Sequence, residues 1–319
     1  MNAASIIVIP GRRWISRVCG PAAFLLLLAF TGGGCSVRHY ALNQAANALA
    51  HTGSTFASDD DPALIQAAAP FSLKLMESVL AENPDHPELL AATAAGFTQF
   101  SYAYVQEDAD ETEPHDLAAA EALRARARRL YLRAQRYGMH GLEVKHPGFG
   151  AALKANPKQA VRMADKSDVP LLYWTGASWA AAIALSKDNP ELVAQLPSME
   201  ALMDRALELD ESWNRGAIHT FMITYEMSRT TVGGDAAARS RAQFDRAMAL
   251  SKGTLAAPMV AYAEAVCVQK QDVKQFESLL NQALAINADD YPDVRLENLI
   301  MQRRARWLLS RKTELFLVE

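Results

Sequence analysis

The side chains that could do chemistry are scattered along this chain. It has seven histidines, and His219, in the stretch GAIHTF, is the only one inside a clearly helical repeat. A histidine acts as a general acid, base or ligand beside a partner, and the sequence places none next to it. The chain also lacks a phosphate-binding glycine loop, an HExxH motif and a GxSxG motif. We therefore interpret His219 as a core or groove histidine and expect no enzyme activity.

Metal binding is not indicated by the spacing of the polar residues. His140 and His146 lie close together in sequence, but two histidines without a third ligand do not make a metal site. The acidic run Glu107–Asp116 lacks the central glycine and the final glutamate of an EF-hand loop. The run Asp59–Asp61 precedes Pro62, which is the pattern of a capped helix start. We expect no metal and no cofactor.

The central element is predicted to be the helix of Pro170–Pro190, PLLYWTGASWAAAIALSKDNP. It carries no charge from Leu171 to Leu185, and that uncharged stretch is shorter than the roughly 20 residues needed to cross a bilayer. A helix that is apolar on every side is typical of the interior of a larger helical assembly. We predict that other helices surround it.

Three aromatic residues of this helix are the candidate ligand or channel residues: Tyr173, Trp174 and Trp179. One interpretation is that they are core, because aromatic residues at helical spacing usually pack. The other is that some of them line an internal cavity for an apolar ligand. We expect Tyr173 or Trp174 to face such a cavity, because Trp179 lies in the alanine-rich half, where tight helix contact is favoured.

A repeat follows the central helix. The segments MDRALELD, FDRAMALS and LNQALAIN contain Ala206, Ala247 and Ala283, which are 41 and 36 residues apart. Such periods, with a small residue where helices cross, are typical of stacked helical hairpins of the tetratricopeptide (TPR) type. We predict an all-α fold of degenerate TPR-like hairpins, α-solenoid-like, around the buried central helix.

Two segments before the central helix are predicted to be loops. They are the acidic Glu107–Asp116 and the glycine-rich Gly138–Gly150. The helix between them carries six arginines, and we interpret it as a solvated surface balanced by the preceding acidic residues. Those arginines are Arg124, Arg126, Arg128, Arg129, Arg133 and Arg136.

Charge and cysteine content exclude two classes of protein. The chain has 32 basic and 36 acidic residues, and without residues 1–34 the net charge is −7, which argues against a nucleic-acid partner. Of the three cysteines, only Cys267 lies beyond residue 35, so a disulfide framework is excluded. We expect Cys267 to be a buried thiol.

The N-terminus is typical of a bacterial secretion signal. Three arginines precede the apolar stretch Ala22–Phe30, and small residues lead to Cys35. This arrangement resembles a lipobox, with Gly32 at the position where leucine is usual. We predict a lipoprotein-type signal peptide at residues 1–34, a single mature domain at residues 35–319, and lipid attachment at Cys35. Ordinary signal cleavage is the alternative.

A longer stretch resembles a known family. Asn47–Leu80 is similar to the opening of the T-component lipoproteins of tripartite ATP-independent periplasmic (TRAP) transporters. The resemblance continues in order and spacing over essentially the whole mature chain. The further matches are Leu172–Trp174 with Trp179, Gly233–Asp235, Phe244–Ala247, Tyr262–Ala263, Phe276 with Leu279–Leu280, and Leu296–Leu309.

The resemblance implies a function for the chain. It implies a periplasmic accessory lipoprotein that docks the solute-binding protein of a TRAP transporter. It also implies an apolar channel that binds or passes a small apolar or carboxylate ligand, and a homo-trimer. Ser36 after Cys35 favours the outer membrane, by analogy with enteric sorting rules. A general envelope scaffold that binds other proteins is the alternative, because helical repeats mostly bind proteins.

Overall fold

The computed structural model describes residues 40–317, and all regular structure in that range is helical. The all-α prediction is therefore confirmed. The chain forms two units, Met1–Gln44 and Ala45–Glu319, and every helix below belongs to the second. The predicted signal peptide and the predicted lipid attachment at Cys35 lie outside the described residues.

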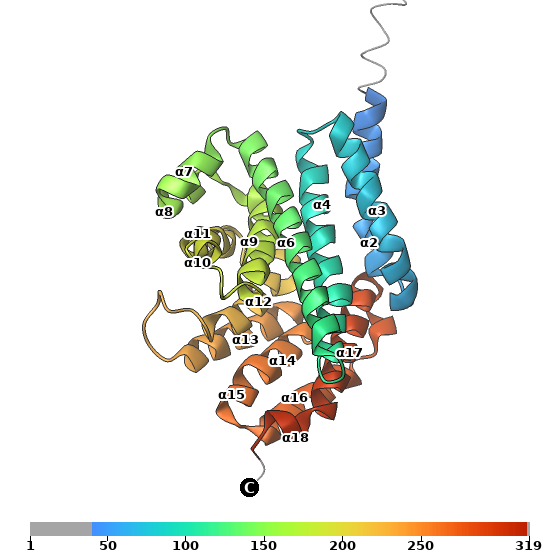
Figure 1. The fold of residues 1–319 in the computed structure, drawn as a ribbon, viewed down its shortest axis with the longest axis vertical. Helices are drawn as coiled ribbons and strands as arrows, with labels where there is room; N and C mark the ends of the chain where they lie inside the picture. The colour runs from blue at the N-terminus through green and yellow to red at the C-terminus, as the bar shows by residue number, and fades with distance from the viewer. Residues whose placement is uncertain (1–39, 318–319) are drawn as a thin grey trace, which may run out of the picture. The chain divides into compact units, whose positions relative to one another are not determined.

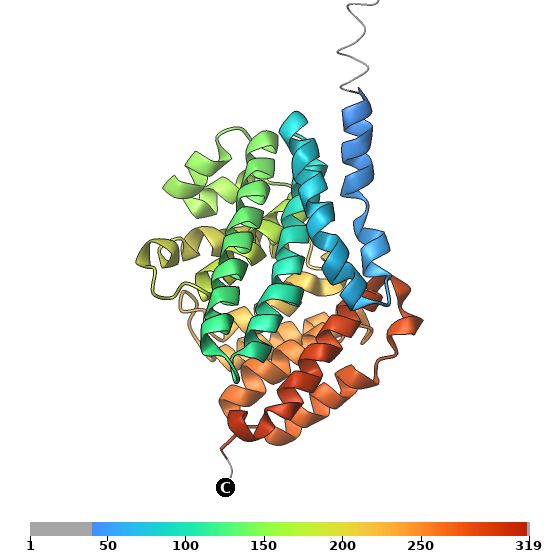
Figure 2. The ribbon, with the colours of Figure 1, turned by 45° about the vertical axis from the view of Figure 1, so that its right-hand side comes forward.

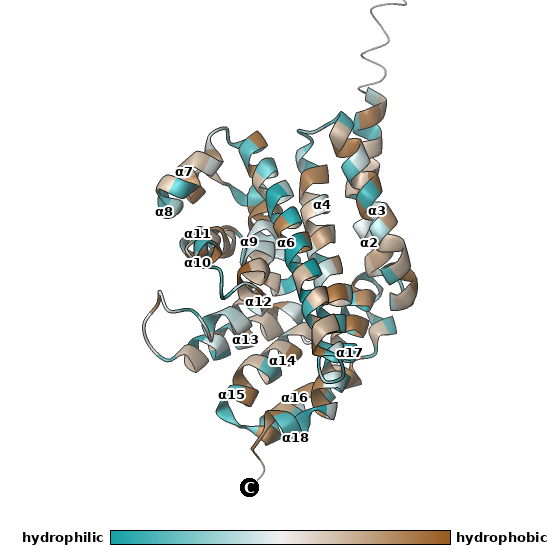
Figure 3. Ribbon diagram, viewed as in Figure 1, coloured by the Kyte–Doolittle hydropathy of each residue, from teal (hydrophilic) through white to brown (hydrophobic). Residues whose placement is uncertain are grey.

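The first part of the second unit is a set of long helices. α4, the π-helical η1 and α5 run as one continuous helix, and the chain returns as α6 to form a hairpin (Figures 1 and 2). α3 packs against α4. Figure 3 shows hydrophobic segments on α4 and hydrophilic segments along α6. The bounds are α2 Gly53–Ala57, α3 Pro62–Glu82, α4 Pro87–Phe100, η1 Ser101–Gln106, α5 Glu107–Thr112 and α6 Leu117–Lys145.

The predicted central helix is α9, and it packs against α4, α6 and α11. Nine of its 16 residues are buried, so the prediction of a buried helix is confirmed, but the helix ends at Ala184 and not near Pro190. Its bounds and those of its neighbours are α7 Phe149–Ala155, α8 Pro157–Ala160, η2 Val161–Met163, η3 Lys166–Asp168, α9 Val169–Ala184, α10 Pro190–Val193 and α11 Leu196–Leu209.

The C-terminal part is built from shorter helices. Ala206, Ala247 and Ala283 lie on α11, α13 and α16, and each is completely buried. The bounds are η4 Trp213–Gly216, α12 Ala217–Glu226, α13 Ala236–Ser251, α14 Ala257–Tyr262, the π-helical η5 Ala263–Cys267, α15 Val268–Lys270, α16 Val273–Ala285, η6 Ala288–Asp290, η7 Pro292–Val294, α17 Arg295–Ser310 and α18 Lys312–Leu315.

The start of α3 is capped as the sequence indicates. An oxygen of Asp61 accepts hydrogen bonds from the backbone N–H groups of Ala63 and Leu64, each at 3.0 Å. Pro62 occupies the first turn, where its missing N–H costs nothing.

Among the described helices, α3 is also the one that is long and apolar enough to cross a membrane. It packs on α4, so we describe it as part of the folded unit.

The predicted loop at Gly138–Gly150 is wrong over most of its length. α6 continues to Lys145, and Gly138 and Gly141 are buried inside it. A Cβ atom on Gly138 would lie 2.0 Å from Oγ1 of Thr175 on α9. The close approach of two helices therefore requires glycine at this position. The glycine content of the segment does not mark irregular backbone here.

Replacing Gly138 with alanine is expected to destabilise the protein. Overpacking at this crossing costs about 1–3 kcal/mol, and the better helix propensity of alanine returns at most about 1 kcal/mol. Gly150→Ala is the matched control, because a Cβ there meets its nearest atom at an ordinary 3.5 Å. Urea unfolding of the two variants checks this, and equal stabilities would contradict the close approach.

The predicted acidic loop at Glu107–Asp116 is also wrong in its first half. Residues Glu107–Thr112 form α5. Asp108 accepts a hydrogen bond from Nη2 of Arg303 at 2.7 Å, and Asp110 accepts one from Nη1 of Arg304 at 3.0 Å. Both arginines lie almost two hundred residues away on α17. Their charges compensate the acidic residues, which therefore form an ordered helix.

Candidate functional site

The aromatic residues of α9 fall into two groups. Tyr173 and Trp174 are half-buried and pack with Trp213 of η4. The ring centroid of Tyr173 lies 4.9 Å from that of Trp174 and 4.8 Å from that of Trp213. Trp179 is buried elsewhere, and its Nε1 donates a hydrogen bond to Oε1 of Gln195 at 3.0 Å. The structure thus brings Tyr173 and Trp174 together with Trp213, and it leaves Trp179 apart.

An unusual turn positions Trp213, which sequence reasoning missed. The next three residues, Asn214, Arg215 and Gly216, have φ angles of 44°, 56° and 84°. Left-handed backbone is unfavourable for residues other than glycine and often marks functional segments. The same turn places the guanidinium of Arg215 against Asp293 and within 3.2 Å of Oγ1 of Thr254. Asn214 followed by a glycine two residues later was the only local signal for this turn.

Glu297 of α17 combines two properties that are rarely found together. Its side chain is exposed, yet burial raises the pKa of its carboxyl to about 7, an effect that Arg215 partly opposes. Burial likewise raises the pKa of Tyr173, and the charge of Glu297 adds to the effect. In the ligand-binding proposal below, the half-buried rings of Tyr173, Trp174 and Trp213 form the wall of an interior recess.

Tyr102 of η1 shows the same combination. It is 37% exposed, and its pKa is raised well above its usual value, first by burial and then by the nearby Glu107. The charge of Arg304 also acts on it. Arg304 stands two helical turns after Glu297, so the two residues share one face of α17.

Arg304 joins the π-helical η5 to α5, the helix that continues from η1. Its Nε donates to Oε2 of Glu264 in η5 at 3.2 Å, and its Nη1 donates to Oδ2 of Asp110, just after η1, at 3.0 Å. Its guanidinium also lies 4.3 Å from the ring centroid of Trp307. π-helical turns occur frequently at functional sites. One buried cation thus links a π-helical turn, η5, to the helix that follows the other.

Glu107 lies beside this cluster without a partner of its own. It is 2% exposed, and neither carboxyl oxygen has a hydrogen-bond partner among the described residues. Burial raises the pKa of this carboxyl to about 7, against the attraction of Arg304. A buried carboxyl in this state holds a proton near neutral pH.

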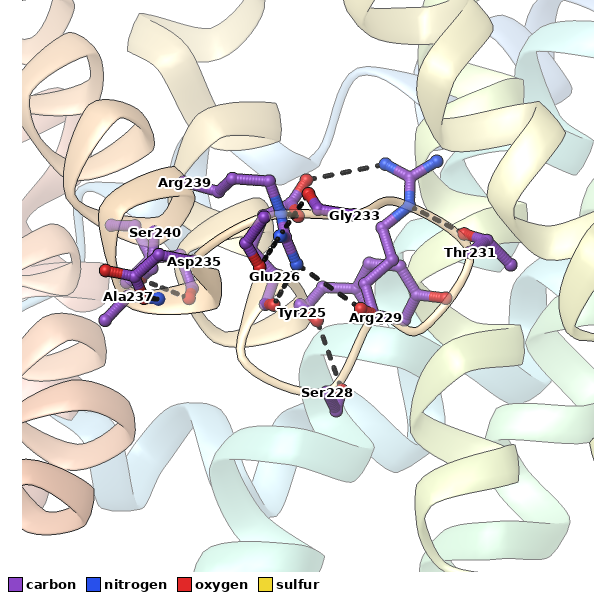
Figure 4. Close-up of polar contacts among 12 residues, drawn as sticks. Tyr225, Glu226, Ser228, Arg229, Thr231, Gly233, Asp235, Ala237, Arg239 and Ser240 are labelled. Carbon is purple, nitrogen blue, oxygen red and sulfur yellow. Dashed lines mark hydrogen bonds and ion pairs between the residues drawn. The ribbon is translucent and has the colours of Figure 1, made fainter.

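The loop between α12 and α13 is held by two arginines (Figure 4). Nη1 of Arg239 donates to the carbonyl oxygens of Gly233 and Gly234 at 2.9 and 3.1 Å, and its Nε donates to Oε2 of Glu226 at 2.7 Å. Arg229 ties the same loop to α11 through two hydrogen bonds to Asp204, at 3.0 and 2.6 Å. Gly234 has a φ of 91° and therefore requires glycine. This explains Gly234 of the Gly233–Asp235 motif structurally.

The histidines are engaged in ordinary pairs. Nδ1 of His219 lies 2.6 Å from Oε1 of Gln243, and its Nε2 lies 3.3 Å from Oε2 of Glu211. His140 and His146 contact Asp85 and Asp168 at 3.0 and 2.8 Å. Within residues 40–317, no group of three histidine, cysteine, aspartate or glutamate side chains could hold a metal ion.

His219 also borders a surface pocket of about 670 Å³. Four acidic residues line it, and each already has a basic partner: Asp204 with Arg229, Glu208 with Arg205, Asp210 with Lys166, and Glu211 with Arg246. The pocket therefore offers no uncompensated charge to a ligand.

Cys267 is buried as expected, and burial raises the pKa of its thiol to about 12, so it is unreactive.

The described residues form an all-helical protein with regular helices throughout. The chain belongs to the TRAP transporter T-component family, because the model of that family matches residues 58–316. An uncharacterized protein of Treponema pallidum (strain Nichols) is 27% identical to it, and the match covers 94% of this chain and 98% of that relative. T-components are transporter accessories of the cell envelope and are not known as enzymes. The chain is thus a TRAP-associated envelope component.

Proposed function

We propose that this protein docks the extracytoplasmic solute-binding protein of a TRAP transporter. The observation that carries the proposal is the family match over residues 58–316. The all-helical architecture supports it, because stacked helices present extended surfaces that bind other proteins. We also propose that α11 to α17 are degenerate TPR-like hairpins, with Ala206, Ala247 and Ala283 at the helix crossings.

Direct binding tests the docking proposal. The purified protein should bind the solute-binding protein of its own TRAP system in biolayer interferometry, and it should not bind a solute-binding protein from an ATP-driven importer. Equal binding to both, or to neither, would remove the support for docking. Either result would favour the alternative function, a general envelope scaffold that binds other proteins.

We propose further that the interior recess binds or passes a small apolar or carboxylate ligand. The half-buried rings of Tyr173, Trp174 and Trp213 support this, because aromatic walls with a few polar groups are typical of ligand sites. Trp179 was an initial candidate, but its buried position beside Gln195 makes it a packing residue in this proposal.

Self-association is the next part of the proposal. Leu64, Phe71 and Leu75 lie on the outward side of α3, and all three are exposed. An apolar stripe on a helix surface is typical of a contact with another protein. We propose that copies of the chain form a homo-trimer through this stripe, and analytical ultracentrifugation would give the number of subunits.

Lipid anchoring gives a further prediction. If Cys35 is acylated, replacing it with serine should move the protein from the membrane fraction, which we propose to be the outer membrane, into the soluble periplasmic fraction. A Cys267→Ser variant is the control, because Cys267 is buried and should leave fractionation unchanged. Fractionation with immunoblotting measures this, and a wild-type protein that is already soluble would contradict the anchor.

A further inference from the structure

We propose that one side of α6 docks an acidic face of a partner protein. The docking surface is a line of basic side chains, which we call the basic row: Arg126, Arg129, Arg133, Arg136 and His140. The inference rests on the proposed function, under which the partner is the solute-binding protein of a TRAP transporter. It adds where on this chain that partner binds and which charge its contact surface carries.

The spacing puts the basic row on one line along α6. Its members follow one another after three, four, three and four residues, which keeps them on one side of an α-helix. At a rise of about 1.5 Å per residue, the row is about 21 Å long. Four members are exposed, and the side chain of the fifth, Arg133, is 38% exposed. A partner that lies along the helix can therefore contact all of them.

The predicted balance between the arginines of α6 and the preceding acidic segment holds only at Arg124, which lies outside the basic row. The acidic side chains are taken by Arg124 and by two arginines of α17. The pairs are Asp108 and Glu111 with Arg303, Asp110 with Arg304 and Arg124, and Glu113 with Arg124. The acidic segment therefore leaves the charges of the basic row unbalanced.

Two carboxylates of α3 and of the segment after it neutralise part of the basic row. Nε of Arg133 lies 2.7 Å from Oε1 of Glu77, a carboxylate that Lys74 also contacts at 2.6 Å. Nε2 of His140 lies 3.0 Å from Oδ1 of Asp85. Within residues 40–317, no carboxylate pairs with the other three members, Arg126, Arg129 and Arg136. Three positive charges thus stay open on a chain whose net charge is −4.

The other two carboxylates of α6 do not change this balance. Glu121 precedes Arg126 by five residues, which places it about 140° around the helix from the row. Glu143 lies at the end of the row, but its two oxygens accept hydrogen bonds from the backbone N–H groups of Gly148 and Gly150 at 2.6 and 2.8 Å.

The C-terminal half of the basic row borders a surface pocket of about 280 Å³. Two contacts fix its walls: Tyr137 donates a hydrogen bond to Oε1 of Glu77 at 2.8 Å, and the guanidinium of Arg133 lies 5.2 Å from the ring centroid of Phe97 on α4. Side chains held in place before binding lose less entropy when a partner arrives. The lining residues all carry N–H or O–H donors, and they are Arg133, Arg136, Tyr137 and His140.

This pocket favours protein carboxylates over the phosphates of a membrane surface. Because Arg133 contacts Glu77 through Nε, its two Nη groups form a fork that can receive one carboxylate with two hydrogen bonds. Arginine and tyrosine around a pocket are typical of the centre of a protein interface. A lipid surface attracts basic residues by charge and needs neither a fixed fork nor a pocket. Carboxylates three and four residues apart on a partner helix would match the spacing of the row.

Neutralising two exposed arginines tests the inference. In the double variant Arg129→Gln/Arg136→Gln, affinity for the solute-binding protein of the same TRAP system should fall about tenfold, mainly through slower association, because opposite charges steer the encounter. Biolayer interferometry with the purified protein measures both rates. Added salt should weaken binding of the wild type more than binding of the variant. Both arginines are exposed and have no carboxylate partner within the described residues, so thermal unfolding should be unchanged.

A matched control removes two positive charges elsewhere. Lys158 and Arg162 are exposed on α8 and η2, and Lys158→Gln/Arg162→Gln should bind as the wild type. Equal affinities of the basic-row variant and this control would overturn the inference. A wild type that does not bind the solute-binding protein would overturn the docking proposal itself, so the two failures are distinguishable.

A membrane is the competing occupant of the basic row. Flotation of the Cys35→Ser protein with phosphatidylglycerol vesicles tests it, and we expect no difference between proteins with and without the Arg129→Gln/Arg136→Gln change. If that change abolishes flotation and leaves binding of the solute-binding protein intact, the row binds lipid and the inference is wrong.

Discussion

Replacing Trp179 with alanine is expected to destabilise the protein by about 3–5 kcal/mol. The side chain is 7% exposed, and its Nε1 is bonded to Gln195. The substitution would therefore leave a cavity between α9 and the α10–α11 segment and an unpaired amide oxygen. Chemical denaturation gives the change in the free energy of unfolding. Binding of octanol, an apolar probe for the proposed interior recess, should stay unchanged in the folded variant, because Trp179 lies apart from Tyr173, Trp174 and Trp213.

Trp174→Ala is the matched comparison for that result. Trp174 is only half-buried, and it contacts Tyr173 and Trp213 rather than a closed core. Its loss should cost about 1–2 kcal/mol and should change octanol binding, because part of the recess wall is removed. If stability and probe binding fall in parallel in both variants, the two tryptophans are equivalent core residues. The distinction between recess and core would then be wrong.

The second large effect is a dependence of stability on pH that originates at Glu107. Burial raises the pKa of this carboxyl in the folded protein to about 7, from an ordinary value of 4.5. The folded state therefore holds the proton more tightly than the unfolded state. As a result, the contribution of Glu107 to stability is greatest below pH 4.5, falls as the pH rises towards 7, and is level above that. The whole difference is on the order of 3 kcal/mol.

Glu107→Gln isolates this contribution. The glutamine cannot titrate, so the variant should gain about 3 kcal/mol relative to the wild type between pH 4.5 and pH 8. All other titrating groups are present in both proteins and cancel in the comparison. Glu121→Gln serves as the exposed control and should follow the wild-type curve. Urea unfolding across this pH range measures the difference, and parallel curves for wild type and Glu107→Gln would show that Glu107 is solvated.

Local signals in the sequence predicted much of the fold. The acidic residues before Pro62 act as the cap of α3, the uncharged stretch around Trp179 is the buried helix α9, and Ala206 is completely buried. These features depend on neighbours along the chain or on one periodic pattern. Such information is present in any short window of sequence.

The predictions failed where the structure depends on distant residues. The charges of Glu107–Thr112 are compensated by Arg303 and Arg304 from α17, and residue 138 is a glycine inside α6 because Thr175 of α9 approaches it closely. The candidate site was predicted only in part for the same reason. Tyr173 and Trp174 stand out as aromatic residues on an apolar helix, whereas Trp213 joins them only through the left-handed turn of η4.

The π-helical segments have a consequence for insertions and deletions. A π-helical turn accommodates one more residue than an α-helical turn. Deleting a single residue from Ser101–Gln106 would restore α geometry and rotate the following residues by about 100°. Glu107 and Asp110 would then point away from Arg304. The extra residue of this π-helical turn therefore determines whether Glu107 and Asp110 lie beside Arg304. A homologue that lacks the extra residue would keep the helix and lose this charge cluster.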